Sequence, residues 1–312
     1  MTQAIAVPPA GVAARRPTRA NPIDRGGAKA GWAFLAPFGV FYVLFLLGPA
    51  VAMLVVSFFN TSTVKPGLGT FAGFGNYAEM FGRADFWDAM WHTVQFTIYT
   101  TPPLVILAFV LSVLTNRIGR GQWFFRLAFF LPFVLPSATI SLIWLFIFTP
   151  GSGLWALGEQ AIGITPGSGV LASPNTAMLG IALATVWWTL GFNFVLYLAG
   201  LQEIPRELYE AAAVDGATQW EQIRYITLPL IRRTTTLVIL LQIIASLKIF
   251  DQVYLMTSGG PGTATQVALG LVTGTAFTDN RIGAASAASV LLFIVILAIA
   301  VIRQLLDRRK EA

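Results

Sequence analysis

Long apolar stretches without Asp, Glu, Lys or Arg alternate with short polar connections over most of the 312-residue chain. About 20 consecutive apolar residues cross a bilayer as a helix, because a helix satisfies its own backbone hydrogen bonds in hydrocarbon. The stretches therefore predict an all-α polytopic membrane protein with six transmembrane helices. The expected spans are 32–58, 91–114, 123–148, 178–201, 232–256 and 284–304.

Prolines and small residues modify this pattern at two places. Pro132 and Pro136 should kink the third span, either for helix packing or as a hinge in a moving bundle. Small residues over 283–289 open the sixth span and let another backbone approach closely, which indicates tight packing. Residues 1–30, rich in Pro, Ala and Arg, are expected to form a disordered tail before a membrane domain at 31–306. Residues 307–312 would be a short C-terminal tail.

Charge changes the picture through its distribution. Charged residues make up 11% of the chain against roughly 25% in soluble domains, and the net charge is +6. In the six-span topology the lysines and arginines lie on one side, except Lys65, Arg83 and Arg281 on the other side and Lys248 within the fifth span. The positive-inside rule then puts both termini and the 203–231 connection in the cytoplasm. The basic excess reflects topology, so nucleic acid is not an expected partner.

Several chemistries are excluded by what the sequence lacks. The chain has no cysteine and one histidine, which excludes a disulfide framework and a thiolate metal site. It contains no Gly-Lys pair, so it has no phosphate-binding loop and should not hydrolyse ATP itself. His92 lies at the outer end of a span, where a structural role is favoured over a proton relay.

The 203–231 connection is the one sizeable polar segment between spans, and its pattern predicts two short helices. Pro205 suits a helix start and Gly216 a helix stop. Thr218 and Glu221 form a T-x-x-E capping box for the second helix, which Leu228-Pro229 ends. The pair either docks a soluble partner or lies as an amphipathic unit on the membrane or on its own bundle.

Polar residues within the spans are candidates for a solute pathway, because intramembrane polar groups are costly. Thr189, Asn193 and Tyr197 form one stripe on the fourth span, and Asn193 lies about 15 Å from its cytoplasmic edge. Gln242 reaches a similar depth on the fifth span, and Ser246 lies one turn further along it. Amides and hydroxyls beside the ring of Trp187 or Tyr197 suit a neutral polyol, although interhelical hydrogen bonding is the plain alternative.

Lys248 and Asp251 lie closer to the outer face of the fifth span. Their i, i+3 spacing allows an ion pair, and Lys248 could also extend outward to water. A structural pair at an outer gate is the favoured interpretation, and contact with an arriving solute stays open.

The 203–231 connection resembles the EAA motif of binding-protein-dependent ABC importer permeases, which reads Glu-Ala-Ala, three residues, Gly, nine residues, Ile-x-Leu-Pro. The matching positions are Glu210, Ala211, Ala212, Asp215, Gly216, Ile226, Leu228 and Pro229. The segments 191–212, 250–265 and 283–289 are similar to the sugar branch of that family, which includes permeases for maltose and glycerol 3-phosphate. Arg232, where a second proline is common, and His92, where Asn is common, depart from the pattern outside the motif core.

The resemblance implies a transmembrane permease in a bacterial cytoplasmic (inner) membrane that carries a carbohydrate or related polyol. The loop would dock in a cleft of a cytoplasmic ATPase, where Glu210 meets a basic group, Ala211 and Ala212 allow close approach, and Gly216 makes the turn. The implied partners are a second, non-identical permease, two ATPase copies, an extracytoplasmic solute-binding protein and membrane lipid. ATP and Mg would bind the ATPase, and this chain would hold no cofactor.

Three other functions remain to be weighed. A permease of the same architecture could carry a peptide or an osmolyte, since the sugar-branch segments report descent and do not describe a pocket. An ion-coupled secondary transporter needs titratable groups at mid-membrane, and none is present there. A membrane-embedded enzyme has no Ser-His pair, acid dyad or metal cluster to support it.

Overall fold

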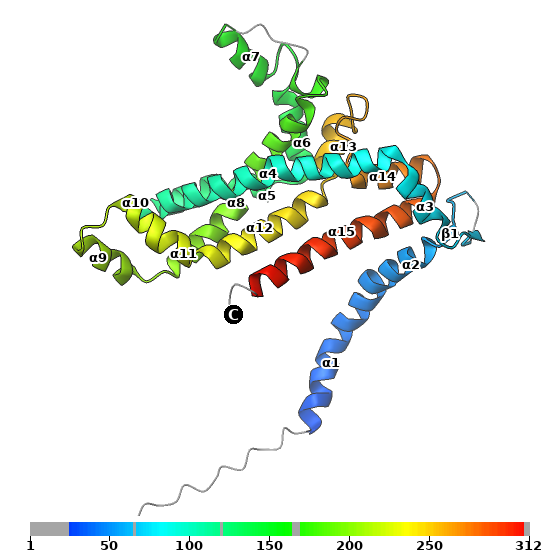
Figure 1. Cartoon of the computed structure of the whole chain (residues 1–312), viewed down its shortest axis with the longest axis horizontal. Helices are drawn as coiled ribbons and strands as arrows, with labels where there is room; N and C mark the ends of the chain where they lie inside the picture. Colours follow the sequence, from blue (N-terminus) through cyan, green and yellow to red (C-terminus); the bar gives the residue numbers. More distant parts are fainter. Residues whose placement is uncertain (1–24, 65–66, 119–120, 164–168, 309–312) are drawn as a thin grey trace, which may run out of the picture. The chain divides into compact units, whose positions relative to one another are not determined.

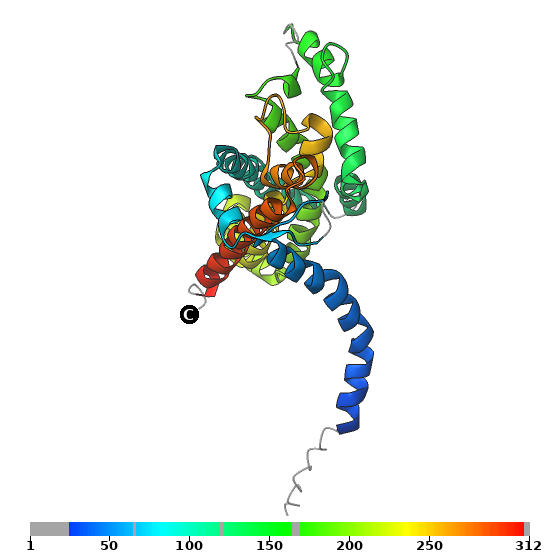
Figure 2. The same cartoon turned by 90° about the vertical axis from the view of Figure 1, so that its right-hand side faces the viewer.

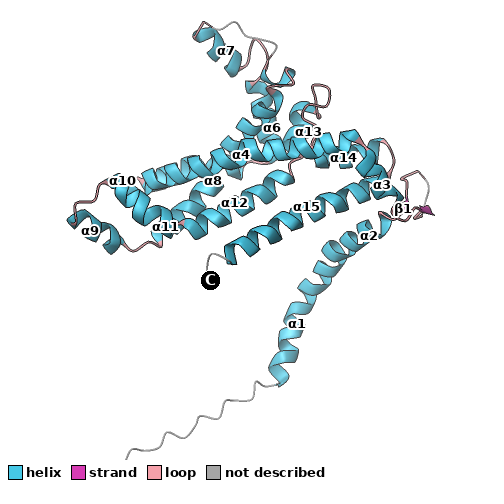
Figure 3. Ribbon diagram, viewed as in Figure 1, coloured by secondary structure: helices cyan, strands magenta, loops and turns pink. Residues whose placement is uncertain are grey.

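The chain is almost entirely helical in the computed structural model, which describes residues 25–64, 67–118, 121–163 and 169–308 (Figure 1) (Figure 3). Its two compact units are Met1–Ala52 and Met53–Ala312. Most of the predicted tail at 1–30 lies outside the described residues, and Arg25 already begins the first helix. The predicted all-α membrane architecture is confirmed, with two-residue strands as the only β-structure among the described residues.

The first unit consists of α1 (Arg25–Tyr42), a π-helical turn η1 (Val43–Leu47) and the start of α2 (Gly48–Val56). Gly31–Val56 forms one apolar candidate span, and none of its residues is buried. Pro49 has no N–H to offer the carbonyl four residues earlier, and the helix widens just before it, where the Gly48 N–H bonds to the Val43 carbonyl.

Four helices make up the bundle of the second unit: α4 (Ala84–Arg117), α8 (Ala177–Gln202), α12 (Arg232–Leu247) and α15 (Ile282–Arg308). They run alongside one another in Figure 1, where α4 packs on α8 and α12, and α12 packs on α15. The contact of α4 with α8 follows from its sequence. Phe96, Thr100, Leu104 and Ala108 recur every four residues, are all buried, and so form one stripe.

Two of the predicted spans are broken. The third consists of α5 (Gln122–Val134) and α6 (Ser137–Ile147), which meet at 96°, so the predicted proline kink is a full break. The fifth is not one helix over 232–256. Instead, α12 ends at Leu247 and α13 (Asp251–Thr257) begins after a three-residue gap, with Asp251 in the first turn, where an acidic side chain stabilises a helix start. By length and composition, four helical stretches within the described residues can cross a membrane. The number rises to six if two bent pairs each count as one span, namely α5 with α6 and Gln219–Leu230 with Arg232–Leu247, which meet at 65°.

The connection between α8 and α12 occupies one end of the bundle, which we call the loop end. It consists of α9 (Arg206–Val214), α10 (Gln219–Gln222), the π-helical turn η3 (Ile223–Thr227) and α11 (Leu228–Leu230). Leu201, Ile204 and Ile231 anchor both ends of this connection in a buried cluster with Phe194 and Tyr197 of α8.

The opposite end of the bundle, the far end, carries the small elements. These are β1 (Phe59–Asn60) paired antiparallel with β2 (Thr70–Phe71), α3 (Gly75–Gly82), α14 (Ala268–Thr273) and the π-helical turn η4 (Gly274–Thr278). The small residues over 283–289 pack here as predicted, since a Cβ on Gly283 would lie 1.9 Å from the Phe59 carbonyl oxygen. Between α6 and α8 the chain forms α7 (Leu154–Ala161) and the 3₁₀ turn η2 (Val170–Ala172), and Figure 2 shows α6 and α7 rising out of the bundle.

Candidate functional site

The first candidate site is the helix–turn–helix connection at the loop end. α9 ends in a Schellman motif: the Ala217 N–H donates to the Ala212 carbonyl at 2.9 Å, and the Gly216 N–H donates to the Ala213 carbonyl at 3.1 Å. Gly216 has a φ of +82°, in the left-handed region that favours glycine. The predicted stop at Gly216 is therefore confirmed, and it reverses the chain between the two short helices.

The predicted capping box at Thr218 and Glu221 is also confirmed. The Glu221 backbone N–H donates to Thr218 Oγ1 at 3.3 Å, and the Thr218 N–H donates back to Glu221 Oε2 at 2.6 Å. The Thr218 hydroxyl also donates to the same carboxylate, and these bonds lower the pKa of Glu221 below its ordinary value. The second helix therefore begins at Gln219, directly after its N-cap residue Thr218.

A π-helical turn precedes Pro229 and was not expected from the sequence. Pro229 lacks the N–H that would bond to the carbonyl four residues earlier, and the backbone widens so that the Leu228 N–H reaches the Ile223 carbonyl. Thr227 in this turn forms a 2.9 Å hydrogen bond with the Tyr209 hydroxyl of α9. The Leu-Pro pair thus shapes the turn, and the Thr227–Tyr209 bond ties the two helices together.

The connection has a buried face and a free face, and the predicted motif residues divide between them. Ile226 packs with Tyr209 and Ile223 on the core cluster. Glu210, Ala211, Asp215 and Gly216 are exposed, Ala212 is half-buried, and Leu228 and Pro229 are exposed. Val214 lies on the free face with 89% of its surface exposed. A rigid unit that presents alanine and valine beside carboxylates is suited to docking against another protein.

Arg117, the last residue of α4, holds the second helix of the connection. Its Nη1 donates to Gln219 Oε1 at 2.5 Å, and its Nη2 lies 3.5 Å from the Gln219 carbonyl oxygen. The sequence offered Arg117 only as a topological charge. The bond means that α4, α8 and α12 all reach the same connection at the loop end.

The second candidate site is a cavity of about 310 Å³ where α5 and α8 meet the gap between α12 and α13. Of the predicted pathway residues, Thr189, Gln242, Ser246, Lys248 and Asp251 line it. Asn193 does not line it and is instead buried next to Gln242, to which its Nδ2 donates at 3.2 Å. Phe96, Phe133, Phe192 and Phe250 supply apolar walls, so the cavity combines aromatic surface with amide, hydroxyl and charged groups.

The two predicted aromatic residues lie elsewhere. Tyr197 is fully buried with its ring edge-on to Phe109 at 5.7 Å, and Trp187 packs against Trp144. The neighbouring Trp188 lines the cavity instead, and its indole N–H donates to the Leu135 carbonyl at the α5–α6 break. Helical spacing turns adjacent residues about 100° apart, so the sequence alone did not separate Trp187 from Trp188.

Lys248 and Asp251 form no ion pair with each other, contrary to the pairing allowed by their spacing. The break after Leu247 separates them, and Asp251 Oδ2 instead accepts a 2.8 Å hydrogen bond from Ser137 Oγ at the start of α6. This bond joins the break in the third predicted span to the break in the fifth. Both Lys248 and Asp251 remain exposed on the cavity wall.

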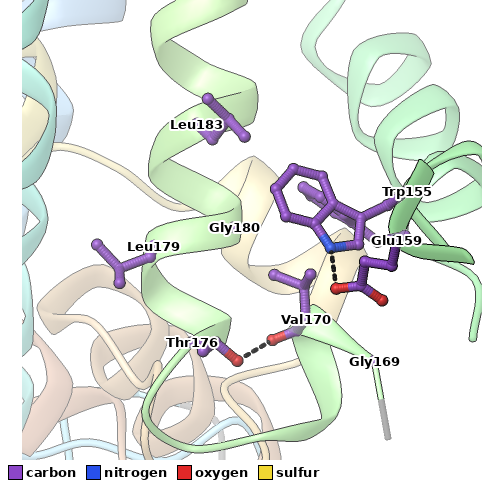
Figure 4. Close-up of a pocket in the computed structure, with 9 residues that line it drawn as sticks. Trp155, Glu159, Gly169, Val170, Thr176, Leu179, Gly180 and Leu183 are labelled. Carbon is purple, nitrogen blue, oxygen red and sulfur yellow. Dashed lines mark hydrogen bonds between the residues drawn. The ribbon is translucent and has the colours of Figure 1, made fainter. Parts of the chain in front are cut away.

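A larger cavity of about 420 Å³ lies between α7, η2 and the start of α8 (Figure 4). Trp155 Nε1 donates to Glu159 Oε1 at 2.8 Å, and Thr176 Oγ1 donates to the Val170 carbonyl at 2.6 Å. Its remaining walls are aliphatic or aromatic, including Leu179 and Leu183, and it contains none of the predicted site residues. The smaller cavity at the helix breaks therefore has the richer polar chemistry.

Histidine and acidic residues do not form a metal centre in the described part of the chain. The His92 ring nitrogen Nδ1 lies 3.1 Å from the Gln266 carbonyl oxygen, which fastens α4 to the segment before α14. This contact fits the structural role favoured for His92.

Comparison with known proteins places the chain in a family. Residues 65–312 match the family described as binding-protein-dependent transport system inner membrane component. The chain is 32% identical over 291 residues to the sulfoquinovosyl glycerol transport system permease protein SmoG of Agrobacterium fabrum, covering 93% of this chain and 94% of SmoG. It is 30% identical over 275 residues to the trehalose/maltose transport system permease protein MalF of Thermococcus litoralis, covering 88% of this chain and 92% of that one.

The fold agrees with this relationship. A chain in the crystal structure of a bacterial alginate ABC transporter, in complex with an alginate pentasaccharide-bound periplasmic protein, is similar with a TM-score of 0.80 and 21% identity, covering 91% of this chain and 96% of that chain. The protein therefore belongs to the family of binding-protein-dependent transport system inner membrane components, which makes it a multi-pass transport subunit and not an enzyme.

Proposed function

We propose that the chain is the transmembrane permease subunit of an ATP-driven bacterial ABC importer for a carbohydrate or related polyol. The observation that carries this proposal is the loop-end connection, in which exposed Glu210 and Ala211 lie on α9 and exposed Asp215 directly follows it. The Gly216 turn and the Thr227–Tyr209 bond hold α9 in place. The relatives' names support the solute class, since they include permeases for sulfoquinovosyl glycerol and for trehalose and maltose.

The connection is suited to passing force into the bundle. α8 enters it and α12 leaves it, and both helices line the cavity at the breaks. A displacement of α9 by a cytoplasmic ATPase would therefore act directly on two walls of that cavity. In this mechanism nucleotide-driven closure of the ATPase shifts the permease between two conformations, and the chain itself performs no hydrolysis. ATP and Mg belong to the ATPase.

The cavity at the breaks would form this subunit's part of the solute pathway. Its phenyl and indole rings can lie against the apolar faces of a sugar, while Thr189, Gln242 and Asp251 offer hydrogen bonds to hydroxyl groups. Trp187 and Tyr197 would act in packing, given their aromatic partners. Ser246 is shared between the cavity and a 2.9 Å bond to Thr97 of α4.

The charge pattern and the family support the remaining features of the proposal. Both termini and the loop end would face the cytoplasm, as the clustered lysines and arginines favour. The complete transporter would contain a second, non-identical permease, two ATPase copies and an extracytoplasmic solute-binding protein.

Reconstitution tests the proposal. The chain is placed in proteoliposomes with the permease, ATPase and binding protein that a search of its genomic neighbourhood identifies, and is supplied with labelled trehalose, maltose, a dipeptide and glycine betaine. We expect ATP-dependent uptake of a carbohydrate that requires the binding protein. Uptake confined to the peptide or to glycine betaine would contradict the carbohydrate assignment, and failure of the chain to bind any ATPase would contradict the coupling role.

A further inference from the structure

Asn193 lies behind the wall of the cavity at the helix breaks. It is 1% exposed and does not line the cavity, whereas Gln242 on the facing helix α12 does. Asn193 Nδ2 donates one hydrogen to the Thr189 carbonyl and the other to Gln242 Oε1, both at 3.2 Å. The side chain therefore contacts a cavity residue without reaching the cavity itself.

These two bonds fix the orientation of both amides. The Thr189 carbonyl can only accept a hydrogen bond, so the nitrogen of Asn193 and not its oxygen must face it. The second hydrogen of that nitrogen needs an acceptor, so Gln242 must turn its oxygen toward Asn193. The Gln242 amide nitrogen is then left to face the cavity, where it offers N–H donors.

This geometry leaves the amide oxygen of Asn193 unpaired. Asn193 Oδ1 is buried and has no hydrogen-bond partner within the described part of the chain. A buried amide oxygen without a partner destabilises the fold, so simple packing favours an apolar residue of the same size here. The presence of an amide at position 193 is explained if its nitrogen orients the side chain of Gln242.

We propose that Asn193 is a positioning residue that sets the hydrogen-bond polarity of the solute pathway, an inference that rests on the proposed carbohydrate function. With Gln242 held by Asn193, the Gln242 amide presents N–H donors to the cavity, as the Lys248 ammonium does, while the neighbouring Ser246 and Asp251 oxygens can accept. On the α8 side, the Thr185 and Thr189 hydroxyls donate to helix carbonyls at 2.9 and 2.8 Å, which leaves their oxygens to accept. A passing sugar would turn an ether or ring oxygen toward Gln242 and hydroxyl hydrogens toward the threonines of α8.

A double-mutant cycle in the reconstituted transporter tests this role. Asn193→Leu, Gln242→Leu and the double variant are compared with wild type for uptake of labelled trehalose or maltose, whichever wild type carries, at saturating binding protein. Each single variant should lower the rate per assembled complex by about twofold to fivefold, as expected for one neutral hydrogen bond. The double variant should match Gln242→Leu alone, because Asn193 acts only through Gln242.

Thr100→Val is the matched control, since Thr100 is equally buried in the bundle and its hydroxyl bonds only to the Phe96 carbonyl of its own helix. It should leave the rate unchanged. Additive losses in the double variant, or a full wild-type rate for Asn193→Leu, would overturn the positioning role. If wild type carries neither trehalose nor maltose nor any other sugar of a wider panel, the carbohydrate function fails first, which separates the two outcomes.

Discussion

Two positions in this molecule, 216 and 191, require glycine for different physical reasons. Gly216 is needed for its backbone conformation, since nothing lies within 4 Å of a Cβ placed there but its φ is +82°. Gly191 is needed for its lack of a side chain, since a Cβ there would lie 2.0 Å from the Phe129 carbonyl oxygen where α8 crosses α5. Both glycines are therefore predicted to be intolerant of substitution, but with different consequences.

Gly216→Val should leave the protein inserted in the membrane and abolish transport and ATPase attachment. A β-branched residue in the left-handed region is strained, so the turn between α9 and α10 would open. Glu210→Lys should give the same phenotype through charge reversal on the exposed face. Co-purification of the ATPase with the membrane-inserted variant measures this effect. Ala213→Val adds similar bulk to exposed α9 without the backbone restraint. If this control lost ATPase attachment equally, the backbone conformation at Gly216 would not be the cause.

Gly191→Ala should instead destabilise the bundle, by about 1–3 kcal/mol, because the added methyl forces α5 and α8 apart. The measurement is thermal denaturation of the purified complex followed by tryptophan fluorescence. Gly158→Ala on α7 is the control, since no atom lies within 4 Å of the added Cβ. If Gly191→Ala were as stable as Gly158→Ala, the contact between α5 and α8 would have room for a methyl group, contrary to this prediction.

The helices show which features of the fold sequence patterns can predict. Apolar runs located α4, α8 and α15 well, and the capping box and Gly216 gave the loop-end helices their boundaries. The patterns missed the π-helical turn before Pro229, because a missing N–H does not by itself say how the backbone adjusts to it. They missed the gap after Leu247, because no glycine or proline marks it. They also missed the Ser137–Asp251 bond, since it joins residues 114 positions apart that only the folded chain brings together.

The Tyr209–Thr227 hydrogen bond should hold α9 against the π-helical turn. Tyr209→Phe removes the hydroxyl and costs about 1 kcal/mol, or roughly fivefold in local opening. Hydrogen–deuterium exchange of residues 206–214 in the full transporter should become faster by that factor, with lower coupling between ATP hydrolysis and uptake. Tyr225→Phe changes an exposed ring on the same turn and should leave exchange unaltered. If Tyr209→Phe and Tyr225→Phe exchanged at the same rate, the Tyr209–Thr227 bond would have no role in coupling.

At the scale of the whole second unit, its two ends are built differently. The loop end is tied to α4 through Arg117 and Gln219, and its free face remains open. The far end is closed by hydrogen bonds and ion pairs, among them the paired contact of Arg281 with Glu79, which joins α3 to the start of α15. The loop end therefore leaves a face free for a partner, whereas side-chain contacts hold the elements of the far end together.

Acid should weaken this far-end joint. The hydrogen bond from Arg281 holds the pKa of Glu79 below its ordinary value, so the pair stabilises the fold at neutral pH and loses this contribution as pH falls through the lowered pKa. Both side chains are partly exposed, so the effect should stay under about 1 kcal/mol. Amide protection in α3, corrected for intrinsic exchange, should stay constant from pH 7 to about pH 5 and fall as the pH drops below the ordinary pKa of Glu79. Glu79→Gln should abolish this pH response, and an unchanged response would assign it to other groups.

The 96° break between α5 and α6 has a consequence for how the protein is made. With 13 and 11 residues, neither half is as long as the roughly 20 residues that cross a bilayer unaided. The surface on which α5 packs is α8, which lies later in the chain. During synthesis this segment therefore leaves the ribosome before its docking surface exists, and its final placement in the membrane has to wait for α8 to be translated.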